Sequence, residues 1–153
     1  MRLTTLVFVF SPRWQILLCL KKRWFGEGKR NGAWWKVQEW ESVAQAAVRE
    51  LHEETWISLR PDELLPAGDL YFVYKGKPER DQHCHIFRYD NYAWSFQETD
   101  EMKPQRYPLD QIPYDYMRED DRIWIPELLL FRDLAYQFTF DADGRLLQGK
   151  KLN

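Results

Sequence analysis

Three glutamates in the first half of the chain, Glu50, Glu53 and Glu54, are spaced at i, i+3 and i+4. In an α-helix this spacing places the three carboxylates on one face. Carboxylates held close together repel one another, and a divalent cation that prefers oxygen ligands relieves that repulsion. The spacing therefore predicts a site for Mg²⁺, with Mn²⁺ as the alternative ion, although a solvated acidic surface would show the same pattern.

The residues around the glutamates predict the helix that carries them, over about 43–54. Ser42 followed by Gln45 is typical of a capping box at the start of a helix. We expect Arg49, within the acidic sequence, to bind Glu41 or a neighbouring carboxylate and to hold the acids in one geometry. An apolar row at i, i+3, i+4 and i+7 gives the helix a side to bury: Ala44, Ala47, Val48 and Leu51.

The rest of the chain alternates strand-like and turn-like segments and shows no internal repeat or linker. We expect one domain over 1–153, a basic loop over 21–36, and a C-terminal helix that Pro126 opens and that runs to about 131. The tail, 138–153, is expected to form a hairpin around the letters ADGR. Strands are predicted at 3–10, 15–20, 68–74 and 83–89.

Composition limits the classes of partner. The net charge is −2 over 153 residues, which argues against a protein that binds a nucleic-acid backbone. No apolar run of 18 residues and no secretory signal is present, so we expect no membrane partner and a cytoplasmic location. Cys19 and Cys84 lie in apolar segments and are expected to be reduced core residues. These features predict a monomer that acts on a small molecule.

His83, Cys84 and His85 raise the question of a zinc site. Alternation along a strand puts the two histidines on one face. The sequence offers no second pair of ligands at a spacing typical of zinc sites. We therefore interpret His83 and His85 as structural residues.

The glutamate segment resembles the signature of the Nudix hydrolases, G-x(5)-E-x(7)-R-E-U-x-E-E-x-G-U, where U is aliphatic. Trp35 and Trp56 stand at the two glycines of the signature. Further similarity to the family is found in the stretches RLTTLVFVF, TDEMKP and DDRIWIPELLL, so the resemblance covers nearly the whole chain. Seven other signature positions match in register: Glu41, Arg49, Glu50, Leu51, Glu53, Glu54 and Ile57.

The resemblance implies both a fold and an activity. The fold would be α/β (α+β), an α/β/α sandwich around a mixed β-sheet. The activity would be Mg²⁺-dependent hydrolysis of oxidised purine nucleoside triphosphates, such as 8-oxo-dGTP, to a monophosphate and pyrophosphate. Two alternatives stay open, namely a Nudix pyrophosphatase acting on another nucleoside diphosphate-linked substrate, and a nucleotide-binding domain that tryptophan at the motif glycines has made inactive.

The resemblance also implies roles for individual residues. Asp120 and Asp121 would read the purine edge while sharing one proton, and Arg118 stands where a stacking tryptophan is expected. The metal would be held by Glu50, Glu53, Glu54, Glu101 and the main-chain carbonyl of Trp34, with Arg49 also in the catalytic set. The substrate would be contacted by Thr5, Lys21, Phe25, Asn31, Lys36, Phe72, Asp120 and Asp121.

Tryptophan is unusually frequent in this chain, with 8 residues against 7 glycines. Average glycine usage would give about 11. We interpret most of these tryptophans as glycine codons, UGA being the candidate, read with the wrong genetic code; the alternative is that the protein carries the tryptophans. Only Trp124 resembles an inherited tryptophan. Glycine is expected in the family at Trp24, Trp34, Trp35, Trp40 and Trp56, and also at Trp14 and Trp94.

Overall fold

The computed structural model describes residues 1–21, 30–31, 33–90, 92, 96 and 102–153, and for 20–21, 30–31 and 33–35 it describes the backbone alone. None of the helices in that part of the chain combines the length and the apolar character of a membrane span. Three short 3₁₀ turns lie at Pro61–Glu63, Pro78–Arg80 and Tyr114–Tyr116. The main elements are β1 (Arg2–Ser11), β2 (Gln15–Lys21), β3 (Arg30–Asn31), β4 (Ala33–Lys36), α1 (Val43–Thr55), β5 (Leu65–Tyr74), β6 (Gln82–Tyr89), β7 (Met102–Pro108), α2 (Asp121–Leu129), β8 (Leu134–Phe140) and β9 (Leu146–Lys151).

The strands form one mixed sheet in the order β3-β2-β1-β6-β5-β8-β9, with β4 also paired to β1 and β7 to β2. The pairs β1/β6 and β5/β8 are parallel, and the other pairs are antiparallel. The strands predicted at 3–10, 15–20, 68–74 and 83–89 are confirmed as β1, β2, β5 and β6.

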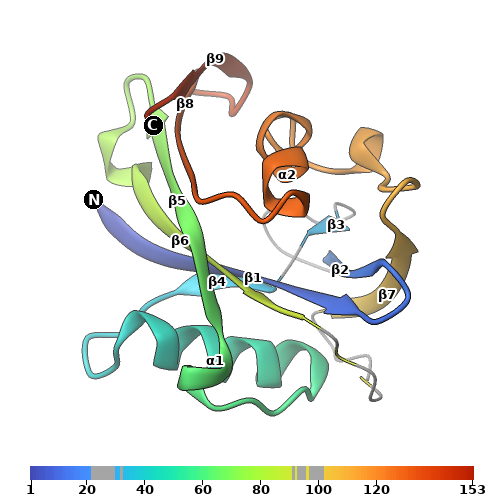
Figure 1. Ribbon diagram of the computed structural model, residues 1–153. Coiled ribbons are helices and arrows are strands. Elements are labelled where there is room, and N and C mark those ends of the chain that lie inside the picture. Colours follow the sequence, from blue (N-terminus) through green and yellow to red (C-terminus); the bar gives the residue numbers. More distant parts are fainter. Residues whose placement is uncertain (22–29, 32, 91, 93–95, 97–101) are drawn as a thin grey trace.

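The two α-helices lie on opposite sides of this sheet (Figure 1). Val7 of β1 packs in one apolar cluster with Leu51 of α1. Phe8, the next residue of the strand, packs in the other cluster with Trp124 of α2. Alternate residues of β1 therefore supply two cores, which confirms the expected α/β/α sandwich and the α+β fold class.

Helix α1 begins as the sequence predicts. Its capping box is complete, because the Gln45 amide donates to Ser42 Oγ at 3.1 Å and the Ser42 amide donates to Gln45 Oε1 at 2.7 Å. The helix ends at Thr55, and the next residue, Trp56, has the left-handed backbone conformation with φ of 66°. Its amide donates to the carbonyl of His52 at 2.8 Å, an arrangement in which glycine is the usual residue.

The described tryptophans fall into two groups. Trp14, in the turn between β1 and β2, has φ of 58° and resembles Trp56 in this respect; Phe131 is another non-glycine residue with positive φ. Trp14, Trp40 and Trp56 are all exposed, whereas Trp124 is fully buried. Burial suits a large indole, and positive φ suits a residue without a Cβ atom, so this division supports the glycine interpretation at positions 14 and 56.

Two predictions about secondary structure are wrong. The segment 21–36 is not simply a loop, because β3 and β4 lie within it and pair with β2 and β1. Helix α2 does not open at Pro126 but begins at Asp121, with Pro126 inside it. Burial of Trp124 and Ile125 against the sheet outweighs the local preference of proline for the first turn. The terminal hairpin is confirmed as β8 and β9.

Candidate active site

Arg49 organises the acidic side of α1. Its Nε lies 2.9 Å from Glu41 Oε2 and its Nη2 lies 2.5 Å from Glu41 Oε1, which is a two-point contact with a buried carboxylate. Its Nη1 pairs with Glu50 and lies 3.6 Å from Glu53 Oε2. The hydrogen bond from Arg49 lowers the pKa of the Glu41 carboxyl. The expected contact between Arg49 and Glu41 is confirmed.

The three glutamates of α1 differ in burial. Glu50 and Glu54 are almost fully buried, whereas 56% of the Glu53 side chain is exposed. Burial, followed by the charge of Glu53, raises the pKa of Glu50 to about 7 although Arg49 opposes the shift. Burial raises the pKa of the Cys19 thiol of β2, and the charge of Glu54 raises it further. The three carboxylates therefore lie at different depths, with Glu53 at the protein surface and Glu54 close enough to β2 for its charge to act on Cys19.

The acidic side chains of α1 are of a chemical type that binds cations, but their oxygens do not converge on one position. Carboxylate oxygens are the ligands that Mg²⁺ prefers, and a cation beside Glu50 would offset the burial and the charge of Glu53 that raise its pKa. Among the described residues, however, Glu50, Glu53 and Glu54 do not place one oxygen each within 4.8 Å of the others. Glu50 is turned towards Arg49, so a cation shared by the three acids requires at least one side chain to turn.

A second group of charges lies beside α2. Arg118 Nε donates to Asp120 Oδ1 at 3.1 Å, and Trp124 Nε1 donates to the other oxygen of Asp120 at 3.0 Å. The Arg118 amide donates to Asp121 Oδ2 at 3.0 Å. Burial, followed by the charge of Asp120, raises the pKa of Asp121 well above its ordinary value. The pair therefore favours a proton on Asp121, while Asp120 accepts a hydrogen bond at each of its oxygens.

Aromatic side chains cover the guanidinium of Arg118. Its Cζ atom lies 4.6 Å from the centre of the Phe72 ring and 5.2 Å from that of Phe140. Phe140 did not stand out in the sequence, although alternation along 134–140 places it on the same face as the buried Phe138. The structure therefore brings Phe72, Asp120 and Asp121 together around Arg118.

Thr5 lies on the other face of the sheet. It alternates with Leu6, which belongs to the cluster of Phe72, and so faces the same side as Val7 and α1. The residue is fully buried, and its hydroxyl has no hydrogen-bond partner among the described residues. Thr5 is therefore not brought together with Phe72.

The remaining predicted residues are placed only in part. Lys36 is exposed at the end of β4, and its carbonyl accepts from Arg49 Nη2 at 3.5 Å, so this strand end lies beside the acids. Phe25 and Glu101 lie outside the described residues. The backbones of Lys21, Asn31 and Trp34 lie in β2, β3 and β4, and their side chains lie outside the description.

Comparison with known proteins is consistent with this arrangement. The NUDIX domain pattern matches residues 1–128. The chain is 40% identical over 149 residues to the oxidized purine nucleoside triphosphate hydrolase of Danio rerio, covering 97% of this chain and 93% of that protein. The protein of the same name from Mus musculus is 40% identical over 146 residues, covering 95% and 91%. A MutT protein of Bacillus halodurans superimposes with a TM-score of 0.84 at 22% identity, covering 99% and 97% of the two chains, and so shares the fold.

Proposed function

The chain belongs to the Nudix family and is a Nudix hydrolase, and on this basis we propose that it hydrolyses oxidised purine nucleoside triphosphates, such as 8-oxo-dGTP, to a monophosphate and pyrophosphate. The observation that carries the proposal is 40% identity, over more than nine tenths of both lengths, to two proteins named for this activity. The acids of α1 support the proposal, because Arg49 connects them to Glu41 and to the end of β4.

The acids of α1 would hold the divalent ion. Glu50, Glu53 and Glu54 are the proposed ligands for Mg²⁺, or Mn²⁺ in its place, with Glu101 and the main-chain carbonyl of Trp34 as further ligands implied by the resemblance. When bound, the ion supplies positive charge that offsets the charge of the polyphosphate and of the departing pyrophosphate.

The protein's own groups would orient the reaction. Arg49 holds Glu41 at two points and Glu50 at a third, which limits the positions open to the carboxylates near the phosphates. One helix carboxylate, or Glu101, would accept the proton of the attacking water. Lys21 and the exposed Lys36 are the proposed phosphate contacts, because ammonium groups pair with phosphate oxygens.

The group beside α2 would recognise the base. Asp120 accepts hydrogen bonds, and a protonated Asp121 donates one. Such a pair can match purine edges that differ in where they carry donors and acceptors. Phe72 is the proposed apolar wall of this pocket, with Phe25 and Asn31 as further contacts implied by the resemblance. Thr5 remains a contact to the nucleoside that the resemblance implies, although it lies on the face of the sheet opposite Phe72.

The test is a comparison of substrates. Release of pyrophosphate from 8-oxo-dGTP, 2-hydroxy-dATP, dGTP and dATP is measured with Mg²⁺. The variant Glu54→Gln removes a proposed ligand, and Glu79→Gln, at an exposed position outside the site, is the matched control. We expect the oxidised nucleotides to be preferred, and Glu54→Gln alone to abolish turnover.

Other outcomes would point to the alternatives. Equal rates on oxidised and ordinary nucleotides would refute the preference for oxidised substrates. Cleavage only of a substrate in which another group is linked to a nucleoside diphosphate would indicate the second Nudix activity. Calorimetric binding without turnover, in protein whose tryptophans are confirmed, would indicate an inactive binding domain.

We further propose that the chain is one domain over residues 1–153 that acts as a cytoplasmic monomer. The net charge of −2 supports a small-molecule partner rather than a nucleic acid or a membrane surface. Size-exclusion chromatography with light scattering would test this state, and a mass of twice 18.7 kDa would contradict it.

A further inference from the structure

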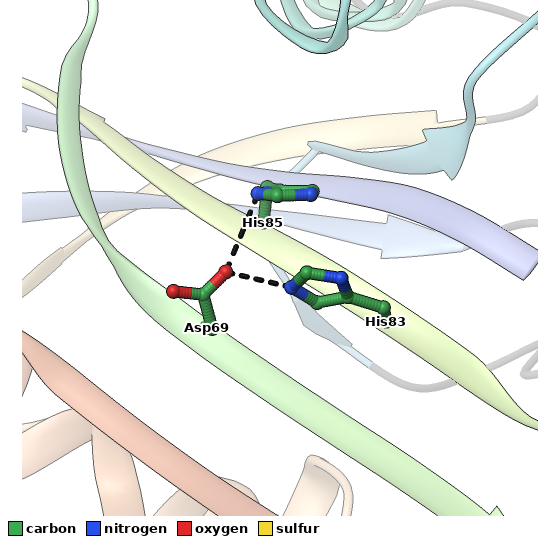
Figure 2. A group of neighbouring side chains, drawn as sticks. All are labelled: Asp69, His83 and His85. Carbon is green, nitrogen blue, oxygen red and sulfur yellow. Dashed lines mark hydrogen bonds and ion pairs between the residues drawn. The ribbon is translucent and has the colours of Figure 1, made fainter. Parts of the chain in front are cut away.

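A cluster of three side chains that are not part of the nucleotide site lies where β5 and β6 run side by side. Asp69 of β5 faces His83 and His85 of β6 (Figure 2). Asp69 Oδ1 lies 2.7 Å from His83 Nε2 and 3.3 Å from His85 Nδ1. One ligand atom from each residue lies within 4.8 Å of the others. Asp69 is the partner that the sequence interpretation of the two histidines lacked.

Strand pairing brings these residues together. Asp69 is the direct partner of His85 in the β5/β6 register, and Tyr71 is the partner of His83. Alternation along each strand puts all of these side chains on one face of the sheet. The ring of Tyr71 stacks on that of His83, with centroids 4.4 Å apart and an angle of 17°. The stacking limits rotation of the His83 imidazole. The pairing of β5 and β6 holds the backbones of the three residues side by side.

We propose that Asp69, His83 and His85 form a second metal site, for a divalent transition metal such as Zn²⁺. Two imidazoles and one carboxylate are a ligand set that first-row transition metals bind. With metal–ligand bonds of about 2.0–2.1 Å, tetrahedral ligand atoms lie about 3.3 Å apart. The separation between Asp69 and His85 is already 3.3 Å, and that between Asp69 and His83 is 2.7 Å, so small side-chain rotations suffice.

The chemistry separates this site from the acids of α1. Mg²⁺ prefers oxygen ligands, whereas imidazole nitrogen suits Zn²⁺ and similar ions. Metals bind the neutral imidazole. Burial, followed by the neighbouring His83, lowers the pKa of His85 although Asp69 opposes the shift.

The surroundings leave room for further ligands. The three side chains are only half-buried, and a cavity of about 360 Å³ is lined by Asp69, His85 and Asp133, among other residues. Thr5 is the partner of His85 in the β1/β6 register, so its side chain lies on the same face of the sheet. Its buried hydroxyl lacks a hydrogen-bond partner among the described residues. Three protein ligands with an open position are typical of zinc sites that also bind water or a small molecule.

The test is metal binding by the whole chain in buffer with excess Mg²⁺, which occupies the oxygen-ligand site. Zn²⁺ binding is measured by competition with a chromogenic chelator, and Co²⁺ binding by its visible absorption. We expect one Zn²⁺ per chain and a Co²⁺ spectrum of low coordination number. Both should be lost in the double variant His83→Ala/His85→Ala, and Asp69→Asn should weaken Zn²⁺ binding at least tenfold.

Control variants separate this site from other sources of binding. His52→Ala removes an exposed histidine outside the cluster and should leave Zn²⁺ binding unchanged. Urea unfolding of each variant shows that it is folded, and His85→Gln replaces the double variant if that one does not fold. Zn²⁺ binding that persists in a folded His85→Gln or double variant would overturn the proposal, as would absence of stoichiometric binding in the parent chain. Either result would leave the hydrolase assignment untouched, because that assignment is tested with Mg²⁺ alone.

Discussion

Replacement of Trp56 by glycine should stabilise this protein relative to a matched replacement elsewhere. Trp56 follows the last turn of α1 with φ of 66°, and 59% of it is exposed. An L-residue in this conformation places its Cβ atom too close to the following carbonyl oxygen, whereas glycine has no Cβ atom. The change therefore removes strain and uncovers little apolar surface.

The magnitude follows from comparison with Trp40→Gly. Trp40 is also exposed, but it is not among the residues with positive φ. Each variant gains entropy in the unfolded chain, which costs about 0.4–1 kcal/mol of folding free energy. Each also loses a peripheral ring contact, which Trp56 makes with His52 at 5.8 Å and Trp40 makes with Arg49 at 6.0 Å. These terms nearly cancel in the difference. The relief of about 1–2 kcal/mol for a left-handed residue remains, so the free energy of unfolding of Trp56→Gly should exceed that of Trp40→Gly by that amount.

Urea unfolding followed by circular dichroism measures the difference. With a slope of about 2 kcal/mol per molar urea, the midpoint of Trp56→Gly should lie about 0.5–1 M above that of Trp40→Gly. Trp14→Gly, at φ of 58°, should behave like Trp56→Gly. Equal midpoints for the variants at positions 56 and 40 would refute the strain argument. Mass spectrometry of protein from its native source tests the translation itself, and tryptophan found at position 56 would refute the recoding hypothesis.

Three further predictions concern charge. Arg49→Ala should lower the free energy of unfolding by about 3 kcal/mol, because it leaves the buried Glu41 without its two-point partner. A loss below 1 kcal/mol, measured by urea unfolding, would contradict this. In buffer with EDTA, the contribution of Glu50 to the free energy of unfolding should fall as pH rises from 4.5 to about 7. Its pKa is raised in the folded state, so the folded state holds a proton that the unfolded state releases. Urea titrations of the parent and of Glu50→Gln at pH 5 and pH 8 measure this contribution, and an equal change with pH in both proteins would contradict it. At pH 8, Asp121→Asn should be at least as stable as the parent, because Asp121 is favoured in its neutral form. Asp120→Asn should lower the free energy of unfolding by about 1–3 kcal/mol, because it weakens the hydrogen bonds from Arg118 and Trp124. The reverse order of stability would assign the proton to the other carboxyl.

Local patterns were sufficient for α1 and its chemistry. The capping pair Ser42 and Gln45, the apolar row and the spacing of the acids all lie within 13 residues, so the sequence alone indicates where the helix begins and which side it buries. The signature around Arg49 was likewise readable, because its contacts with carboxylates are made within one helix or to Glu41 just before it. The main strands also follow from alternation and turn residues.

Tertiary structure decided what depends on segments that are distant in the chain. The strands β3 and β4 exist because β2 and β1 pair with them, and α2 begins before Pro126 because Trp124 is buried against the sheet. Asp69 meets His83 and His85 only through the register of β5 and β6. The order of residues along the chain was enough to identify the family, the glutamate helix and the acids on it. Only the folded sheet decided which side chains from separate strands share a face, because a shift of one residue in strand pairing turns each side chain to the opposite side.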